Sequence, residues 1–127
     1  QRNHDDGDPY ADECRRTAQL LAEALSLGEK DYIVSFQSRF GRSKWVEPST
    51  QDLLENLPSQ GVAKLDVFCP GFISDCLETL EEIALVGREQ FHAAGGKQYQ
   101  YIPCLNADAF WLEALADLAR RNLAGWV

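Results

Sequence analysis

The stretch KLDVFCPGFISDCLETLEEIALVGREQFHAA, residues 64–94, decides the fold of this chain. Its first six residues, 64–69, are rich in β-forming side chains, which predicts a strand. Pro70 and Gly71 then predict a turn that ends this strand. Residues 75–94 place apolar side chains on one side at helical spacing and acidic ones on the other, which predicts a helix. A strand followed directly by a helix is the repeating unit of a parallel sheet.

The same alternation continues on both sides of this stretch. Two further strands are predicted at residues 32–36 and 98–102. Three further helices are predicted, from Pro9 to Leu25, from Thr50 to Leu57, and from Asn106 or Asp108 to Leu123. Helices and strands that alternate along a chain favour a parallel sheet with helices on both faces. The sequence therefore predicts one three-layer α/β domain over residues 1–127.

Size and charge limit the class of protein. The chain has 127 residues and a formal net charge of −8. Such an acidic surface repels phosphate backbones, so nucleic-acid binding is not expected. No apolar run reaches the roughly 20 residues that a membrane span needs, and the polar first nine residues do not form a secretory signal. The chain also opens with Gln1 and contains no Met, so we expect it to be a piece of a longer chain.

The cysteines predict neither a metal centre nor a disulfide framework. Cys14, Cys69, Cys76 and Cys104 are widely spaced, and no C-x-x-C pair occurs among them. This spacing gives no support to a zinc site or an iron–sulfur cluster. Free thiols in a domain with a full core and no export signal predict a cytoplasmic location.

The predicted topology indicates that a ligand binds at two loops. Ligands of parallel sheets bind beyond the carboxyl ends of the strands, which here are followed by residues 37–49 and 70–74. The first loop holds three cations and two aromatic residues within residues 37–45, a combination that suits a small, flat, anionic ligand. The alternative is a solvated loop with Trp45 packed on the core. Phe72, in the second loop, is likewise either a pocket wall or a core aromatic residue.

Two carboxylates on the long predicted helix are the second candidate feature. Glu78 and Glu82 are four residues apart, so they are neighbours on one helical face. Adjacent carboxylates offer hard oxygen ligands to a divalent cation, or a path for protons. The alternative is an ordinary solvated face, with Asp75 and Glu78 forming a capping box. Dinucleotide, P-loop and serine-hydrolase motifs are absent, which argues against those three chemistries.

Five short stretches resemble the ferrochelatase family, whose members insert ferrous iron into protoporphyrin IX. They are GDPY at 7–10, FQSRFGRSKW at 36–45, CPGFISDCLETLEEI at 69–83, GGK at 95–97 and YIPCLN at 101–106. The resemblance is strongest to bacterial members and covers their C-terminal half. It implies a chelatase-like α/β half that forms a porphyrin cleft together with an N-terminal half.

The resemblance also implies roles for individual residues. Glu78 matches a glutamate that acts in proton removal or metal delivery, and Glu82 matches the next acidic position on a path for the metal. Four further residues match positions that line the porphyrin cleft, namely Trp45, Phe72, Gln37 and Ser38. Ferrous iron is then a substrate, and no iron–sulfur cluster is implied. Cys76 replaces the His of eukaryotic members, which argues against a metal relay at that position.

Several alternatives stay open at this point. The family's catalytic histidine precedes the GDPY stretch and His4 does not match it, so we expect this chain to be inactive alone. A non-catalytic porphyrin- or haem-binding module, a cobalt or nickel tetrapyrrole chelatase and an acidic α/β domain without a ligand are the other readings. The resemblance further allows peripheral contact with a membrane, and an isolated half is expected to self-associate through its unpaired surface.

Overall fold

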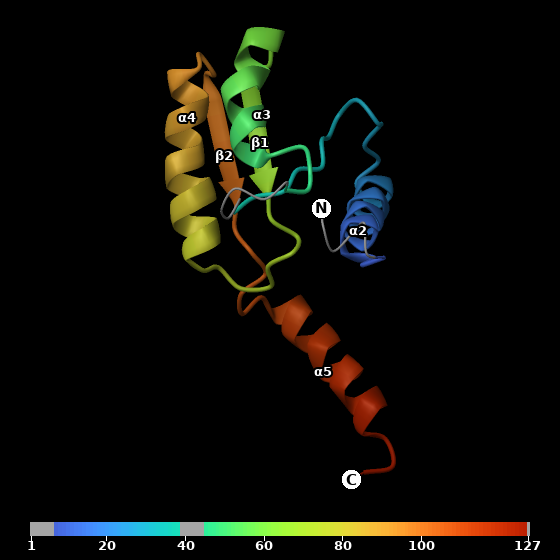
Figure 1. Ribbon diagram of the computed structural model, residues 1–127. Helices are drawn as coiled ribbons and strands as arrows, with labels where there is room; N and C mark the ends of the chain where they lie inside the picture. The colour runs from blue at the N-terminus through green and yellow to red at the C-terminus, as the bar shows by residue number, and fades with distance from the viewer. Residues whose placement is uncertain (1–6, 39–44, 127) are drawn as a thin grey trace.

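The computed structural model describes residues 7–38 and 45–126 and holds a small parallel sheet with helices (Figure 1). Before the sheet come α2 (Tyr10–Ala24), α3 (Thr50–Asn56) and the short 3₁₀ helix η1 (Leu57–Gln60). The central elements are β1 (Lys64–Phe68), the π-helix η2 (Glu78–Gly87), α4 (Arg88–Ala93) and β2 (Gln98–Ile102). The last helix is α5 (Ala109–Leu123).

The two strands pair in parallel, with Leu65 opposite Tyr99 and Val67 opposite Tyr101. These four side chains point to one face of the sheet, because residues two apart in a strand share a face. A parallel pair joined by a helical crossover is the unit that the sequence predicts, so the α/β class is confirmed.

The core lies between this face and the helices. Leu54 of α3, Leu57 of η1, Phe91 of α4 and Tyr99 of β2 form its buried centre. On the opposite face, Asp66, Gln98 and Gln100 are exposed. The layer of helices on one face of the sheet is therefore confirmed, whereas the second face is open to solvent at these positions.

The predicted strand at residues 32–36 is not formed. Only Phe36 takes part in β pairing, as an isolated parallel bridge with Ser49. Its amide donates to the carbonyl of Pro48 at 2.9 Å, and its carbonyl accepts from Thr50 at 3.0 Å. The segment therefore pairs with the turn before α3 and not along β1. The run is β-rich in composition, but the strand prediction is wrong, because a strand needs a longer ladder than this turn provides.

The predicted helix at residues 75–94 is divided into η2 and α4, and η2 winds more widely than an α-helix. The buried residues of η2 are Thr79, Ile83, Ala84 and Gly87, and Phe91 is buried in α4. Hydrogen bonds of the i→i+5 type widen the turn and move each residue around the axis relative to an α-helix.

The wider turn corrects the predicted apolar face. The helical spacing predicts an apolar face of six residues, of which four are buried, namely Ile83, Ala84, Gly87 and Phe91. The other two, Leu77 and Leu80, have exposed fractions of 74% and 50%. Thr79, expected elsewhere, is fully buried. A period of 3.6 residues does not allow for the π geometry of η2, in which Thr79 is buried and Leu80 is exposed.

Close contact between η2 and β2 depends on Gly87. A Cβ atom at this position would lie 2.9 Å from the Tyr99 hydroxyl oxygen and 3.0 Å from Leu54 Cδ1. The same buried hydroxyl donates a hydrogen bond of 2.8 Å to the carbonyl of Ile83. The small residue thus lets Tyr99 reach the backbone of the π-helix.

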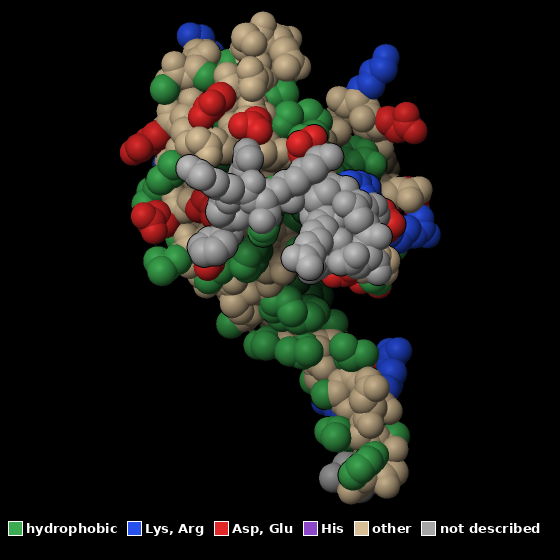
Figure 2. All heavy atoms as spheres, in the orientation of Figure 1, with side chains coloured by type: hydrophobic (Ala, Val, Ile, Leu, Met, Phe, Trp, Pro, Cys, Tyr) green, Lys and Arg blue, Asp and Glu red, His purple; other side chains and the backbone are tan. Residues whose placement is uncertain are grey.

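The last helix, α5, projects away from the sheet (Figure 1). Asp108 caps its N-terminus, as predicted, and accepts hydrogen bonds from the amides of Phe110 and Trp111. None of its residues is buried, and Figure 2 shows hydrophobic side chains at the surface along it. No helix among the described residues is long and apolar enough to span a membrane.

Candidate functional site

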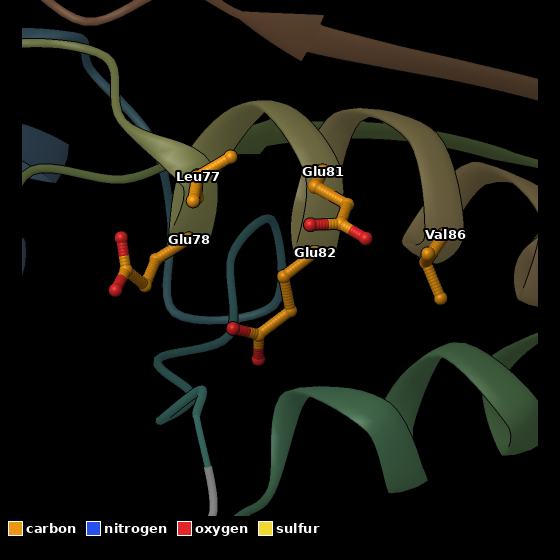
Figure 3. A pocket seen from close by; sticks show the side chains of 5 residues that line it. All are labelled: Leu77, Glu78, Glu81, Glu82 and Val86. Atoms are coloured by element: carbon orange, nitrogen blue, oxygen red, sulfur yellow. The ribbon is translucent and has the colours of Figure 1, made fainter.

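The acidic side of η2 borders an open hollow of about 390 Å³ (Figure 3). The residues that line it are Leu77, Glu78, Glu81, Glu82 and Val86. Glu78 and Glu82 leave η2 on the same side, as their spacing predicts. The hollow therefore presents carboxylates to solvent within an otherwise apolar rim.

Glu82 is held by one residue from a distant part of the chain. Ser38 donates its backbone N–H to Oε1 of Glu82 and its hydroxyl to Oε2, each at 2.7 Å. Hydrogen bonds to an ionised carboxylate are stronger than those between neutral groups. Ser38 has a φ of +60°, a conformation that residues other than glycine adopt rarely. The backbone is thus in an unusual conformation at the point where it contacts Glu82.

Gln37 makes a second link between this segment and η2. Its side-chain amide donates to the backbone carbonyl of Glu78 at 2.8 Å. The indole N–H of Trp45 donates to the backbone carbonyl of Gln37 at 3.2 Å. The Cys69 thiol, at the end of β1, donates to Oε1 of Gln37 at 3.5 Å. Gln37 therefore connects the acidic helix, the aromatic residue and the end of the first strand.

Glu78 is exposed and ionised. Its pKa lies below the usual range, first because the Cys76 thiol donates a hydrogen bond to the carboxylate and then because its own backbone N–H also donates. A lowered pKa favours the charged form at neutral pH. The side chain is therefore available as an anionic ligand for a cation.

Asp75 forms a network that the sequence did not reveal. Its carboxylate accepts from the Tyr101 hydroxyl at 2.6 Å, from the Thr79 hydroxyl at 3.0 Å and from the Asn106 amide at 2.7 Å. The Asp75 amide donates in turn to Oδ1 of Asn106 at 2.9 Å. These contacts, led by those from Asn106 and Tyr101, hold the pKa of Asp75 far below its usual range.

This network fixes the start of η2 to the end of β2. It also replaces the predicted capping box, because η2 has no side-chain cap and Asp75 bonds to Thr79 and not to Glu78. The i, i+4 spacing of Asp75 and Thr79 was the only local signal for it. The partners on β2 and after it, Tyr101 and Asn106, are 26 and 31 residues away.

The structure brings together five of the six predicted site residues, which are Gln37, Ser38, Trp45, Glu78 and Glu82. Phe72 is half-buried in the turn after β1, where its amide donates to the carbonyl of Cys69, and it takes no part in these hydrogen bonds. The predicted basic residues of the first loop, Arg39, Arg42 and Lys44, lie outside the described residues.

The described residues offer a cation only part of a ligand set. No group of three or more His, Cys, Asp or Glu side chains within residues 7–38 and 45–126 is placed to hold a metal ion. Glu78 and Glu82 would need further ligands from water, a substrate or other protein. The four cysteines are free thiols.

Comparison with known proteins identifies the family of the chain. The ferrochelatase family model matches residues 1–123. The chain belongs to the ferrochelatase family. It is 69% identical over 126 residues to a ferrochelatase of Neisseria meningitidis, covering 99% of this chain and 38% of that protein. Ferrochelatases of Chromobacterium violaceum and Dechloromonas aromatica are 56% and 54% identical over 122 and 125 residues, which are 96% and 98% of this chain.

The chain covers only part of the length of each relative. The chain spans 38% of the N. meningitidis ferrochelatase, 34% of the C. violaceum protein and 34% of the D. aromatica protein. More than half of each relative thus has no counterpart in these 127 residues.

Proposed function

We propose that this chain is the C-terminal part of a ferrochelatase and that the whole enzyme inserts ferrous iron into protoporphyrin IX to give protohaem. The observation that carries the proposal is the pair Glu78 and Glu82 on one side of η2, beside the segment of Gln37, Ser38 and Trp45. Family membership supports the same chemistry.

The residues suit the reaction. Two pyrrole protons must leave as the metal enters, so anionic oxygens are needed near the centre of the macrocycle. Glu78 is a carboxylate with a lowered pKa, which favours attraction of Fe²⁺ over retention of a proton. Glu82 supplies the next carboxylate along η2 for metal delivery. Trp45 offers a flat apolar surface to the porphyrin, and Gln37 and Ser38 lie at the edge of the cleft. Phe72, which the resemblance also assigns to the porphyrin, lies in the turn after β1.

The rest of the site comes from an N-terminal half of the same enzyme. That half provides the opposing wall of the cleft and the catalytic base, so this chain alone is inactive. The hollow beside η2 is open, which is consistent with a wall supplied by other protein. The enzyme is cytoplasmic, and its family resemblance allows peripheral contact with a membrane. Iron is its substrate, and it carries no iron–sulfur cluster.

A chimera tests the proposal directly. The 126 matched residues of the N. meningitidis ferrochelatase are replaced by their counterparts from this chain. We expect the chimera to metallate protoporphyrin with Fe²⁺ under anaerobic conditions, followed by the change in Soret absorbance. Glu78→Gln should lower kcat by at least about tenfold, because the neutral amide keeps the size of the side chain but loses the charge that attracts Fe²⁺.

The control is Glu89→Gln, which removes the same charge from an exposed residue of α4. Its activity should equal that of the unsubstituted chimera. Near-normal turnover of Glu78→Gln would reject the role of Glu78. Porphyrin binding without metallation in the unsubstituted chimera would instead favour a binding module, and faster turnover with Co²⁺ or Ni²⁺ would favour a related chelatase.

A further inference from the structure

We infer that Ser38 is a positioning residue, which orients the carboxylate of Glu82 for a divalent cation and does not itself contact the porphyrin. Both hydrogen-bond donors of Ser38, its backbone N–H and its hydroxyl, are used by Glu82. The inference rests on the proposed function, because it assigns Glu82 a cation.

The geometry leaves Glu82 free to bind a metal while Ser38 holds it. An ionised carboxylate has about four lone-pair sites on its two oxygens. Ser38 takes one site on each oxygen, at 2.7 Å. One site on each oxygen therefore stays open, and the rotation of the carboxylate is fixed by two parallel contacts. Residues that hold ligating carboxylates in this way contribute strongly to metal affinity.

The backbone of Ser38 is itself fixed from two sides. The neighbouring Gln37 donates to the carbonyl of Glu78 through its side chain and accepts from the Trp45 indole through its backbone. These contacts hold Ser38 at its φ of +60°, a conformation that persists only where the surroundings impose it. Orientation of Glu82 is thus coupled to the position of Trp45, on the proposed porphyrin side.

Metal binding by the chimera tests the inference. Mn²⁺ alone serves as the probe, because it prefers oxygen ligands and the free ion is counted directly by electron paramagnetic resonance. Ser38→Ala removes one of the two donors and should weaken Mn²⁺ binding by about tenfold. Glu82→Gln should weaken it further, whereas Glu89→Gln should leave it unchanged. In the iron assay, Ser38→Ala should raise KM for Fe²⁺ with little change in KM for porphyrin.

The outcomes separate the inference from the proposed function. Equal Mn²⁺ affinity for the unsubstituted chimera and Ser38→Ala, together with a loss for Glu82→Gln, would overturn the positioning role alone. Unchanged affinity in Glu82→Gln would remove the cation from Glu82 and so overturn the inference, whereas the proposed function fails only if the unsubstituted chimera does not metallate protoporphyrin with Fe²⁺. A raised KM for porphyrin in Ser38→Ala would show direct porphyrin contact and would also overturn the inference.

Two further measurements distinguish loss of the contact from misfolding of a variant. Ser38→Gly also lacks the hydroxyl but adopts positive φ without strain, so it should match Ser38→Ala in Mn²⁺ affinity. Hydrogen exchange reports the contact without any metal. Glu82→Ala should speed exchange of the Ser38 amide by about tenfold or more, the effect of losing a charge-assisted hydrogen bond, while Glu89→Ala should not. Unchanged exchange in Glu82→Ala would contradict the contact.

Discussion

Replacement of Gly87 by alanine should disturb the whole acidic helix. A Cβ atom at this position would lie 2.9 Å from the Tyr99 hydroxyl oxygen, closer than side-chain carbons pack in proteins. Tyr99 cannot withdraw freely, because its ring is buried and its hydroxyl donates to the carbonyl of Ile83 at 2.8 Å. The added methyl group must therefore displace either the hydroxyl from its acceptor or η2 from the sheet.

The expected loss of stability follows from three contributions. Overpacking of a buried site costs about 1–3 kcal/mol. Separation of the Tyr99 hydroxyl from the Ile83 carbonyl leaves two buried polar groups unpaired, which costs about 1–3 kcal/mol more. The better helix propensity of alanine offsets about 1 kcal/mol. We expect Gly87→Ala to lower the free energy of unfolding by about 3 kcal/mol, a large share of the roughly 5–15 kcal/mol of a typical domain.

Urea denaturation of the chain, followed by circular dichroism, measures this loss. Gly71→Ala is the matched control, since a Cβ atom there meets no atom within 4 Å, and it should change stability by less than about 0.5 kcal/mol. Tyr99→Phe removes the hydroxyl that the new methyl group meets. The double substitution Gly87→Ala with Tyr99→Phe should therefore be less destabilising than the two single effects together, by about 1 kcal/mol. Strictly additive effects, or a neutral Gly87→Ala, would refute the reasoning.

Two further predictions concern ionisable groups. The hydrogen bonds from Asn106 and Tyr101 lower the pKa of Asp75, so its contribution to stability is complete above its ordinary pKa of about 4 and falls as the pH drops toward the folded value. Unfolding followed from pH 5 to pH 2 should show this slope in the wild-type chain and a smaller slope in Asp75→Asn; equal slopes would contradict the network. Burial raises the pKa of Cys69 to about 12. Iodoacetamide at pH 8 should therefore modify the half-exposed Cys76 well before Cys69, as read by peptide mass spectrometry, and equal rates would count against burial of Cys69.

The strands and most helices could be predicted from local patterns. The predicted strands at 64–69 and 98–102 agree with β1 (Lys64–Phe68) and β2 (Gln98–Ile102) to within one residue. Both are short runs of β-branched and aromatic residues bounded by glycine and proline, and these signals are local. Helix α5 was predicted equally well, because its cap at Asp108 and its last apolar residue are both visible in the sequence.

The pairing of residues 32–36 and the winding of η2 could not be predicted from local sequence patterns. Residues 32–36 have strand composition, but whether they join a sheet depends on which backbone lies beside them, and Phe36 lies beside Ser49. The winding of η2 depends on tertiary contacts as well. Thr79 is a poor candidate for a fully buried residue by composition, and it is buried because Asp75 accepts its hydroxyl.

The candidate site, like the fold, could be predicted from the sequence only where its signals are local. Spacing alone placed Glu78 and Glu82 on one side of the helix, and the structure agrees, because residues four apart are neighbours in π as well as α winding. The contact of Glu82 with Ser38 spans 44 residues, and no local pattern could reveal it. The resemblance assigns Ser38 to the porphyrin cleft, which stays a prediction, and the structure adds that both of its donors are taken up by Glu82.

Side chains from other elements donate hydrogen bonds to the backbone of the π-helix η2 and support it. π-Helices are rare and mostly limited to a single turn, so a π-helix of 10 residues needs support from outside. Two of its backbone carbonyls receive side-chain donors from other elements, that of Ile83 from Tyr99 and that of Glu78 from Gln37. Asp75 fixes the residues just before it. Because these supports come from β2, the turn after it and the segment of Gln37, the carboxylates of η2 are positioned by the whole domain. A substitution that loosens any one support should therefore displace these carboxylates and, on the proposed function, weaken cation binding, without touching Glu78 or Glu82.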